Sequence, residues 1–300
     1  MCGIVGLHLR DPELHPRLGE LLTGMLCEMQ DRGADSAGVA VYGDPRWSPP
    51  GRVSVSFVPP ARVSTRAQGL LAGLLGTDVV VVPAGQTLVA HVDAAVGVEA
   101  LRTAVAATWP EALLAGFGAD VAVLKGVGHP RDLAEDFGLP AAQGWQGVGH
   151  TRMATESAVT PGGCHPYAVG SDQCLVHNGS LSNHNNLRRE LVREGARFET
   201  ENDSEVAAAY LTARLAEGRN LGEALEGALA DLDGFYTFVV GTKSGFGVLR
   251  DPVACKPAVM AETDRYVAFG SEYRALVGLP GMDLARVWEP EPATVYFWER

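Results

Sequence analysis

The 300-residue sequence has little positive charge and no long apolar run. Its 24 Lys and Arg residues stand against 36 Asp and Glu residues, which gives a formal net charge of −12 at pH 7. Surfaces that hold a phosphate backbone usually carry a surplus of basic residues, so we expect no nucleic-acid partner. No run approaches the roughly 18 apolar residues of a spanning helix, so we expect no membrane partner. Only Lys125, Lys243 and Lys256 are lysines, a scarcity that we interpret as coding bias.

Cysteine is scarce as well, and its spacing is irregular. The five cysteines are Cys2, Cys27, Cys164, Cys174 and Cys255. An odd number without a CxxC pair favours neither a disulfide framework nor a zinc site. The first residues lack the basic segment and the apolar segment of a secretory signal. We therefore expect a soluble, reduced protein of the cytoplasm.

The pattern of apolar residues predicts a layered α+β fold. Leu18, Leu21, Leu22, Met25 and Leu26 recur at three- and four-residue steps, which predicts an amphipathic helix within 14–30. Residues 44–60 are rich in Pro, Gly and Ser and predict an exposed hairpin or loop. Strands and helices are expected in runs rather than in strict alternation, which favours α+β over a doubly wound sheet. Further helices are expected near 98–107, 131–137, 183–195, 204–215 and 221–232, and strands at 3–7, 38–42, 79–82, 87–91, 120–125, 235–241, 246–249, 266–269 and 294–298.

A cysteine stands at the second position, directly after Met1. Initiator methionine is normally removed when the next residue is small, and Cys2 would then carry the free α-amine. Such an amine titrates near pH 8. It can act as a general base for the thiol of its own residue.

Four further segments accompany the N-terminal segment 1–6 in a fixed order. They are 31–38 (DRGADSAG), 149–157 (GHTRMATES), 177–184 (HNGSLSNH) and 201–206 (ENDSEV). Together the five segments resemble the class II glutamine amidotransferases, whose glutaminase domains are N-terminal-nucleophile (Ntn) hydrolases. The resemblance implies a four-layer αββα sandwich and one domain over 2–300, with an insertion at about 44–145 and Met1 removed.

The expected chemistry is the hydrolysis of a carboxamide. Cys2 supplies a thiolate nucleophile, and its α-amine serves as base and then as acid toward the leaving ammonia. The resemblance assigns the oxyanion hole to the side chain of Asn178 and the backbone N–H of Gly179. Taken alone, an Asn-Gly pair is typical of a hairpin turn. We expect His177 to pack at a strand end, because its spacing from His165 and His184 is not that of metal ligands.

Glutamine differs from other amides by its α-carboxylate and α-ammonium groups. The planar guanidinium of Arg152 suits a bidentate contact with the carboxylate, and Asp203 offers the opposite charge to the ammonium. Asp203 also stands where a helix N-cap is expected. The resemblance puts Thr155 and Glu156 at the glutamine pocket, although Glu156 departs from the His or Asn of other members.

Arg32 and Asp35 belong to the second segment. The resemblance implies that Arg32 helps to hold the N-terminal cysteine and its loop. An arginine near the end of a helix also interacts favourably with the helix dipole, so both interpretations stay open.

The resemblance extends to stand-alone subunits of glutamate synthase-like and N-methylglutamate synthase-like systems. It rests on 123–133 and 152–157, and on the gap of 150 − 35 = 115 residues between Asp35 and His150. The 300 − 203 = 97 residues after Asp203 are needed for the sandwich, so we expect no synthase domain in this chain. Partner subunits with flavin and iron–sulfur centres are implied, because the chain has no cysteine cluster or dinucleotide fingerprint. We expect no cofactor and no metal in the chain itself.

The leading hypothesis is an enzyme that hydrolyses L-glutamine to L-glutamate and ammonia through a Cys2 thioester and hands the ammonia to a partner synthase. One alternative is a glutamine-sensing or scaffolding subunit without turnover. The other is an Ntn hydrolase with a different amide substrate. The complete set of catalytic residue types disfavours the first alternative, and the Arg152/Asp203 pair disfavours the second.

Overall fold

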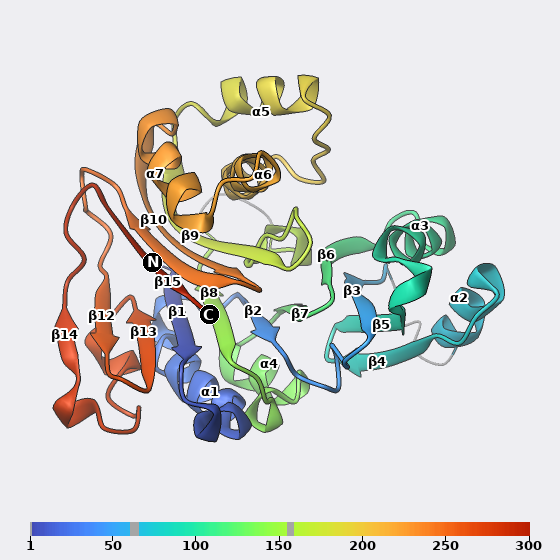
Figure 1. Cartoon of the computed structure of the whole chain (residues 1–300), viewed down its shortest axis with the longest axis horizontal. Helices are drawn as coiled ribbons and strands as arrows, with labels where there is room; N and C mark the ends of the chain where they lie inside the picture. Colours follow the sequence, from blue (N-terminus) through green and yellow to red (C-terminus); the bar gives the residue numbers. More distant parts are fainter. Residues whose placement is uncertain (1, 61–65, 155–158) are drawn as a thin grey trace.

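The computed structural model describes residues 2–60, 66–154 and 159–300, which form a mixed α/β structure of three sheets and flanking helices (Figure 1). One sheet has seven strands in the order β14-β12-β13-β1-β8-β2-β7. The others have four strands each, in the orders β15-β11-β10-β9 and β4-β5-β3-β6. Within these residues, no helix combines the length and apolar character that a membrane span requires.

The seven-stranded sheet has the N-terminal strand near its centre. Its strands are β14 (Arg286–Trp288), β12 (Val259–Glu262), β13 (Tyr266–Gly270), β1 (Gly3–Leu9), β8 (Gln146–Arg152), β2 (Ser36–Tyr42) and β7 (Val121–Val127). All seven residues of β1 are buried, and β1 pairs antiparallel with β13 and with β8. Cys2, the residue before β1, therefore adjoins a central strand that is hydrogen-bonded on both sides.

A four-stranded sheet packs against one face of the seven-stranded sheet. Its strands are β15 (Thr294–Glu299), β11 (Gly245–Arg250), β10 (Gly234–Thr242) and β9 (Gln173–Leu181). Ile4, Val176, Val239 and Phe246 belong to the buried apolar cluster between the two sheets. A Cβ atom on Gly6 would lie 2.8 Å from the Phe246 ring, so the sheets meet where Gly6 has no side chain.

Helices cover the outer faces of these two sheets. Helix α1 (Leu18–Glu28) buries Leu18, Leu21, Leu22, Met25 and Leu26, as the spacing predicts, and packs with α4 (Pro130–Asp136) against the seven-stranded sheet. Helices α6 (Asp203–Ala216) and α7 (Leu221–Asp231) cover the four-stranded sheet, and α5 (His184–Arg193) packs on α6 (Figure 1). Short 3-10 helices span Pro12–Arg17, Gln30–Arg32, Ala94–Val96, Leu139–Ala141, Pro161–Gly163, Tyr273–Ala275 and Met282–Leu284.

The remaining sheet has a core of its own. It consists of β4 (Val80–Ala84), β5 (Thr87–Asp93), β3 (Arg52–Val58) and β6 (Leu113–Gly118), with α2 (Ala67–Leu75) and α3 (Val98–Thr108) packed on it. The prediction of an exposed loop or hairpin over 44–60 is wrong for β3. Val55 and Phe57 of β3 are fully buried in this core. Apolar residues alternate with serines along β3, so one face of the strand is apolar despite the Pro and Gly residues nearby.

We predict that Phe246→Ala lowers the free energy of unfolding by about 3–5 kcal/mol, because it opens a cavity between two sheets that meet closely at Gly6. Val253→Ala is the control, since the Val253 side chain is 64% exposed, and its effect should stay within about 0.5 kcal/mol. Chemical unfolding followed by circular dichroism measures both. Equal small effects would contradict the assignment of Phe246 to the core.

Candidate active site

The backbone of Cys2 is held by side chains from two distant segments. Arg32 Nε donates a hydrogen bond to the Cys2 carbonyl oxygen at 2.9 Å, and Asn178 Nδ2 donates to the same oxygen at 3.2 Å. Arg32 Nη1 also pairs with Glu272 at 2.6 Å. The next residue but one, Ile4, donates its N–H to Ser271 Oγ at 2.9 Å. The thiol is therefore presented by a fixed strand end.

Asp35 fixes the chain that follows β8. Its carboxylate accepts the N–H of Ala154 at 2.8 Å, while its own N–H donates to the carbonyl of Arg152 at 3.1 Å. Asp35 thus orders the segment after Arg152, whereas Arg32 touches Cys2 itself. The predicted pocket residues Thr155 and Glu156 lie outside the residues that the structure describes.

Asn178 and Gly179 lie inside strand β9 and not in a hairpin turn. Both pair with β10, opposite Thr237 and Tyr236. A Cβ atom on Gly179, whose φ is +150°, would lie 2.0 Å from the carbonyl oxygen of Phe235, so only glycine fits there.

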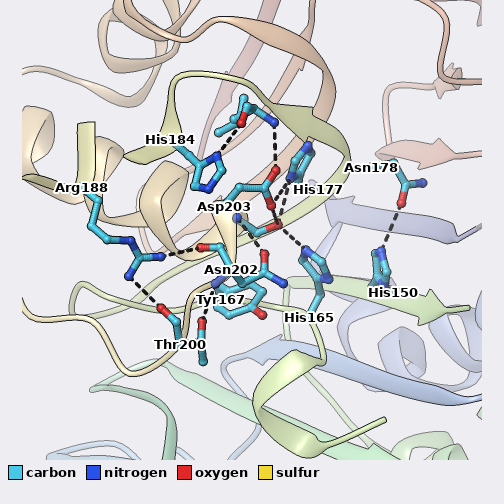
Figure 2. A network of polar contacts seen from close by, with 12 residues as sticks. His150, His165, Tyr167, His177, Asn178, His184, Arg188, Thr200, Asn202 and Asp203 are labelled. Carbon is cyan, nitrogen blue, oxygen red and sulfur yellow. Dashed lines mark hydrogen bonds and ion pairs between the residues drawn. The ribbon is translucent and has the colours of Figure 1, made fainter. Parts of the chain in front are cut away.

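His150 sets the orientation of the Asn178 amide. His150 Nε2 lies 3.1 Å from Asn178 Oδ1, and the amide oxygen accepts this hydrogen bond (Figure 2). The Nδ2 group is thereby directed to the Cys2 side. No role was expected for His150 from the sequence, although it stands in the segment 149–157 beside Thr151 and Arg152. Its burial, with 1% of its surface exposed, is the property that a sequence alone does not reveal.

The same histidine affects the nucleophile. Burial acts to raise the pKa of the Cys2 thiol, but hydrogen bonding and charge from His150 and the backbone of Met153 oppose it. The net pKa is about 7. At that value about half of the thiol is thiolate at pH 7, compared with about 1% for a thiol of pKa 9.

Asp203 stands at the first turn of α6, beside a cluster of buried histidines. The helix is capped by Asn202, whose side chain accepts the Ser204 N–H at 2.9 Å, so the expectation that Asp203 is the N-cap is wrong. Asp203 Oδ2 instead accepts the N–H of Leu181 at 2.9 Å, and Oδ1 lies 3.8 Å from His177 Nδ1.

Ser204 joins two of the histidines. Its Oγ lies 2.8 Å from His177 Nδ1 and 3.0 Å from His165 Nε2 (Figure 2). Burial lowers the pKa of His177 to about 4 despite Asp203, and burial lowers the pKa of His165 as well. Both rings are therefore neutral at pH 7. His177 packs edge-on against Phe238 at the buried face of β9. Among the described residues, no three His, Cys, Asp or Glu side chains are grouped as metal ligands would be.

Arg152 ends strand β8 and is 8% exposed. A Cβ atom on Gly163 would lie 3.1 Å from Arg152 Nη1, so the backbone at Gly163 packs directly against the guanidinium. Cys2, Asn178, Gly179 and Arg152 thus come from strand ends or strands of the two packed sheets. A half-buried thiol, an oriented amide donor and a guanidinium together suit attack on an amide whose substrate carries a carboxylate.

Comparisons with known proteins agree with this chemistry. Residues 150–278 match a family described as a glutamine amidotransferase domain. The chain is 59% identical over 299 residues to the glutamine amidotransferase-like protein GlxB of Rhizobium meliloti (strain 1021), covering 100% of this chain and 98% of that protein. It is 33% identical to a putative glutamine amidotransferase of Methanothermobacter thermautotrophicus, with 100% of both chains covered.

A solved structure shares the fold. The glutamine phosphoribosylpyrophosphate amidotransferase of B. subtilis aligns with a TM-score of 0.61 at 18% identity. The alignment covers 99% of this chain and 47% of that one, so this chain spans about half the length of that enzyme.

We predict that the alkylation rate of Cys2 by iodoacetamide rises as pH increases through about 7. The thiolate is the reactive form, and it dominates above the lowered pKa and is protonated below it. Cys27 is the internal reference, because burial raises the pKa of its thiol and its reactivity should rise only at higher pH. His150→Leu should move the Cys2 midpoint upward. Peptide mass spectrometry measures both cysteines in one sample, and a Cys2 midpoint at or above that of Cys27 would contradict the prediction.

Proposed function

The chain belongs to the class II glutamine amidotransferases, enzymes with an N-terminal nucleophile, and on this premise we propose that it hydrolyses L-glutamine to L-glutamate and ammonia through a thioester on Cys2. The observation that carries the proposal is the Asn178 amide, which His150 orients and which hydrogen-bonds the backbone of Cys2. We propose too that the packed sheets and their helices form the αββα sandwich of Ntn hydrolases, with residues 2–300 as one domain carrying an insertion at about 44–145.

In the proposed reaction, Met1 is removed and the α-amine of Cys2 takes the thiol proton. The thiolate attacks the side-chain carbonyl carbon of glutamine, and the carbonyl oxygen becomes an oxyanion. Asn178 Nδ2 and the N–H of Gly179 donate to that oxygen. The C–N bond then breaks, the amine returns its proton to the leaving nitrogen, and ammonia departs. Water attacks the thioester, releasing glutamate and the thiol.

The proposed clamp on the rest of glutamine consists of Arg152 for the α-carboxylate and Asp203 for the α-ammonium. Two hydrogen bonds hold the Asp203 carboxylate in one orientation: Oδ2 accepts the N–H of Leu181, and Oδ1 accepts the Ser204 hydroxyl at 3.4 Å. Arg32 and Asp35 act as positioning residues, since Arg32 holds the Cys2 carbonyl and Asp35 holds Ala154. Thr155 and Glu156 complete the proposed pocket.

We propose that the ammonia passes to a partner synthase of the glutamate synthase-like or N-methylglutamate synthase-like type, with flavin and iron–sulfur centres in the partner. The support is the similarity of 123–133 and 152–157 to such stand-alone subunits. A glutamine-sensing subunit without turnover is the alternative. The low pKa of the Cys2 thiol favours turnover over sensing, because binding alone needs no thiolate.

We predict that Cys2→Ala abolishes release of glutamate from glutamine, alone or with the partner subunits, while the melting temperature stays unchanged. Cys255→Ala is the matched control, because Cys255 is an exposed thiol whose loss should leave turnover intact. Hydrolysis that persists in Cys2→Ala would refute the proposed nucleophile. A wild-type chain without activity, even with its partners, would favour the sensing subunit.

A second pair of variants separates the two roles. Asn178→Ala should lower kcat about 100- to 1000-fold with little change in KM, because it removes a donor to the oxyanion. Arg152→Lys should mainly raise KM, because the bidentate carboxylate contact is lost. The exposed substitution Arg286→Lys serves as control. Steady-state kinetics on glutamine measure both parameters, and the reverse pattern would contradict the assigned roles.

A further inference from the structure

A cavity of about 650 Å³ lies between the β4-β5-β3-β6 sheet and helices α5 and α6. Strand β6 and helix α3 supply one side of the cavity, and α6 supplies another. None of Cys2, Asn178, Gly179, Arg152 and Asp203 lines it. The volume falls within the range of about 300–1,000 Å³ that is typical of small-molecule sites. This cavity, called the second chamber, is therefore separate from the proposed glutaminase site.

A buried lysine forms part of the cavity wall. Lys125 is 2% exposed, and its strand position in β7 is fixed because Thr87 Oγ1 hydrogen-bonds both its N–H (2.9 Å) and its C=O (3.0 Å). Its ammonium lies 4.8 Å from the centre of the Tyr167 ring. Across residues 2–60, 66–154 and 159–300 this ammonium has no hydrogen-bond or ion-pair partner. Burial lowers its pKa to about 8.

A buried carboxylate lines the same cavity. Glu205, in the first turn of α6, is 6% exposed. Its oxygens accept the N–H of Glu199 and of Thr200, both at 2.8 Å, and the Thr200 hydroxyl at 2.7 Å. These donors hold the carboxylate in a fixed orientation. Glu205 and Lys125 do not pair with each other, so two opposite buried charges face the chamber without a bridge.

The rest of the wall limits the choice of ligand. Ala115, Ala209 and Ala213 leave apolar space, and Phe117 lies under the guanidinium of Arg102 at 3.9 Å. Arg102 is already paired with Glu99 at 2.7 Å. A dianion such as phosphate would meet the Glu205 carboxylate, and an uncharged ligand would leave the buried Lys125 ammonium uncompensated. A small molecule with one charge of each sign satisfies both groups.

We propose that this cavity binds a free α-amino acid zwitterion, with its carboxylate on Lys125, its ammonium on Glu205 and its side chain among the alanines. The ligand supplies the bridge that the protein lacks. This site is separate from the glutaminase site and requires no turnover. Lysine is rare in this chain, and this proposal gives Lys125 a role as the buried basic residue of β7.

The test is isothermal titration of the full chain at pH 7 with glycine, L-alanine and L-glutamate, and with acetate and methylamine as probes of one charge each. At least one amino acid should bind about tenfold more tightly than acetate or methylamine, because only a zwitterion satisfies both charges. Lys125→Met should weaken that binding about tenfold or more. Lys243→Met is the matched control, since Lys243 is exposed and its loss should change nothing.

Two further variants keep the result interpretable. Arg152→Ala should retain the binding while impairing use of glutamine, which separates this site from the proposed clamp. Ala213→Phe should block the cavity without removing a charge, and it decides the outcome if Lys125→Met fails to fold. The proposal is overturned if no amino acid binds at about 10 mM, if acetate binds as tightly as the amino acids, or if folded Lys125→Met or Ala213→Phe binds like the wild type.

Discussion

The pairing of β1 between β8 and β13 is the constraint on which the catalytic centre depends. The first few residues of a domain are normally poorly ordered unless something ties them down. Here Gly3 pairs with Thr151, and the whole of β1 is buried. The Cys2 end of β1 is thus held by the backbone hydrogen bonds of β1, and Arg32 and Asn178 both hydrogen-bond the Cys2 carbonyl. Because β8 also ends in Arg152, one strand pair brings together two groups that the chain separates by 150 residues.

Burial sets the electrostatics of the centre. His165 and His177 stay uncharged because desolvation lowers their pKa values, so they orient neighbours without adding positive charge. His150 differs in its position, since it contacts the amide of Asn178 and lies beside the Cys2 thiol. One imidazole therefore contacts both the proposed nucleophile and the proposed oxyanion donor.

The sequence predicted the parts of the molecule that depend on local pattern or on strict residue identity. The spacing of Leu18, Leu22 and Met25 indicated α1, and the mixed α/β class is confirmed. The prediction from sequence failed at β3. Apolar residues alternate along this short strand and are buried in the core of its own sheet, but the Pro and Gly residues around the strand obscured the pattern. The N-cap of α6 is Asn202, one residue before the expected Asp203, and a difference of one residue is within the usual uncertainty of a helix start.

Contacts between distant segments were beyond the sequence. Nothing in the residues around His150 reveals that it faces Asn178 of another sheet. Lys125 illustrates the same limit. Its charge becomes significant only when two facts are known: the side chain is buried, and its ammonium has no hydrogen-bond or ion-pair partner among the described residues. A sequence pattern identifies residue types, whereas the interpretation of His150 and Lys125 depends on contacts with distant segments.

The first turn of α6 faces three environments with three consecutive side chains. Asp203 reaches the backbone of β9, Ser204 holds two histidines, and Glu205 closes the wall of the second chamber. Because the three residues are consecutive in one helical turn, a displacement of that turn would move all three together.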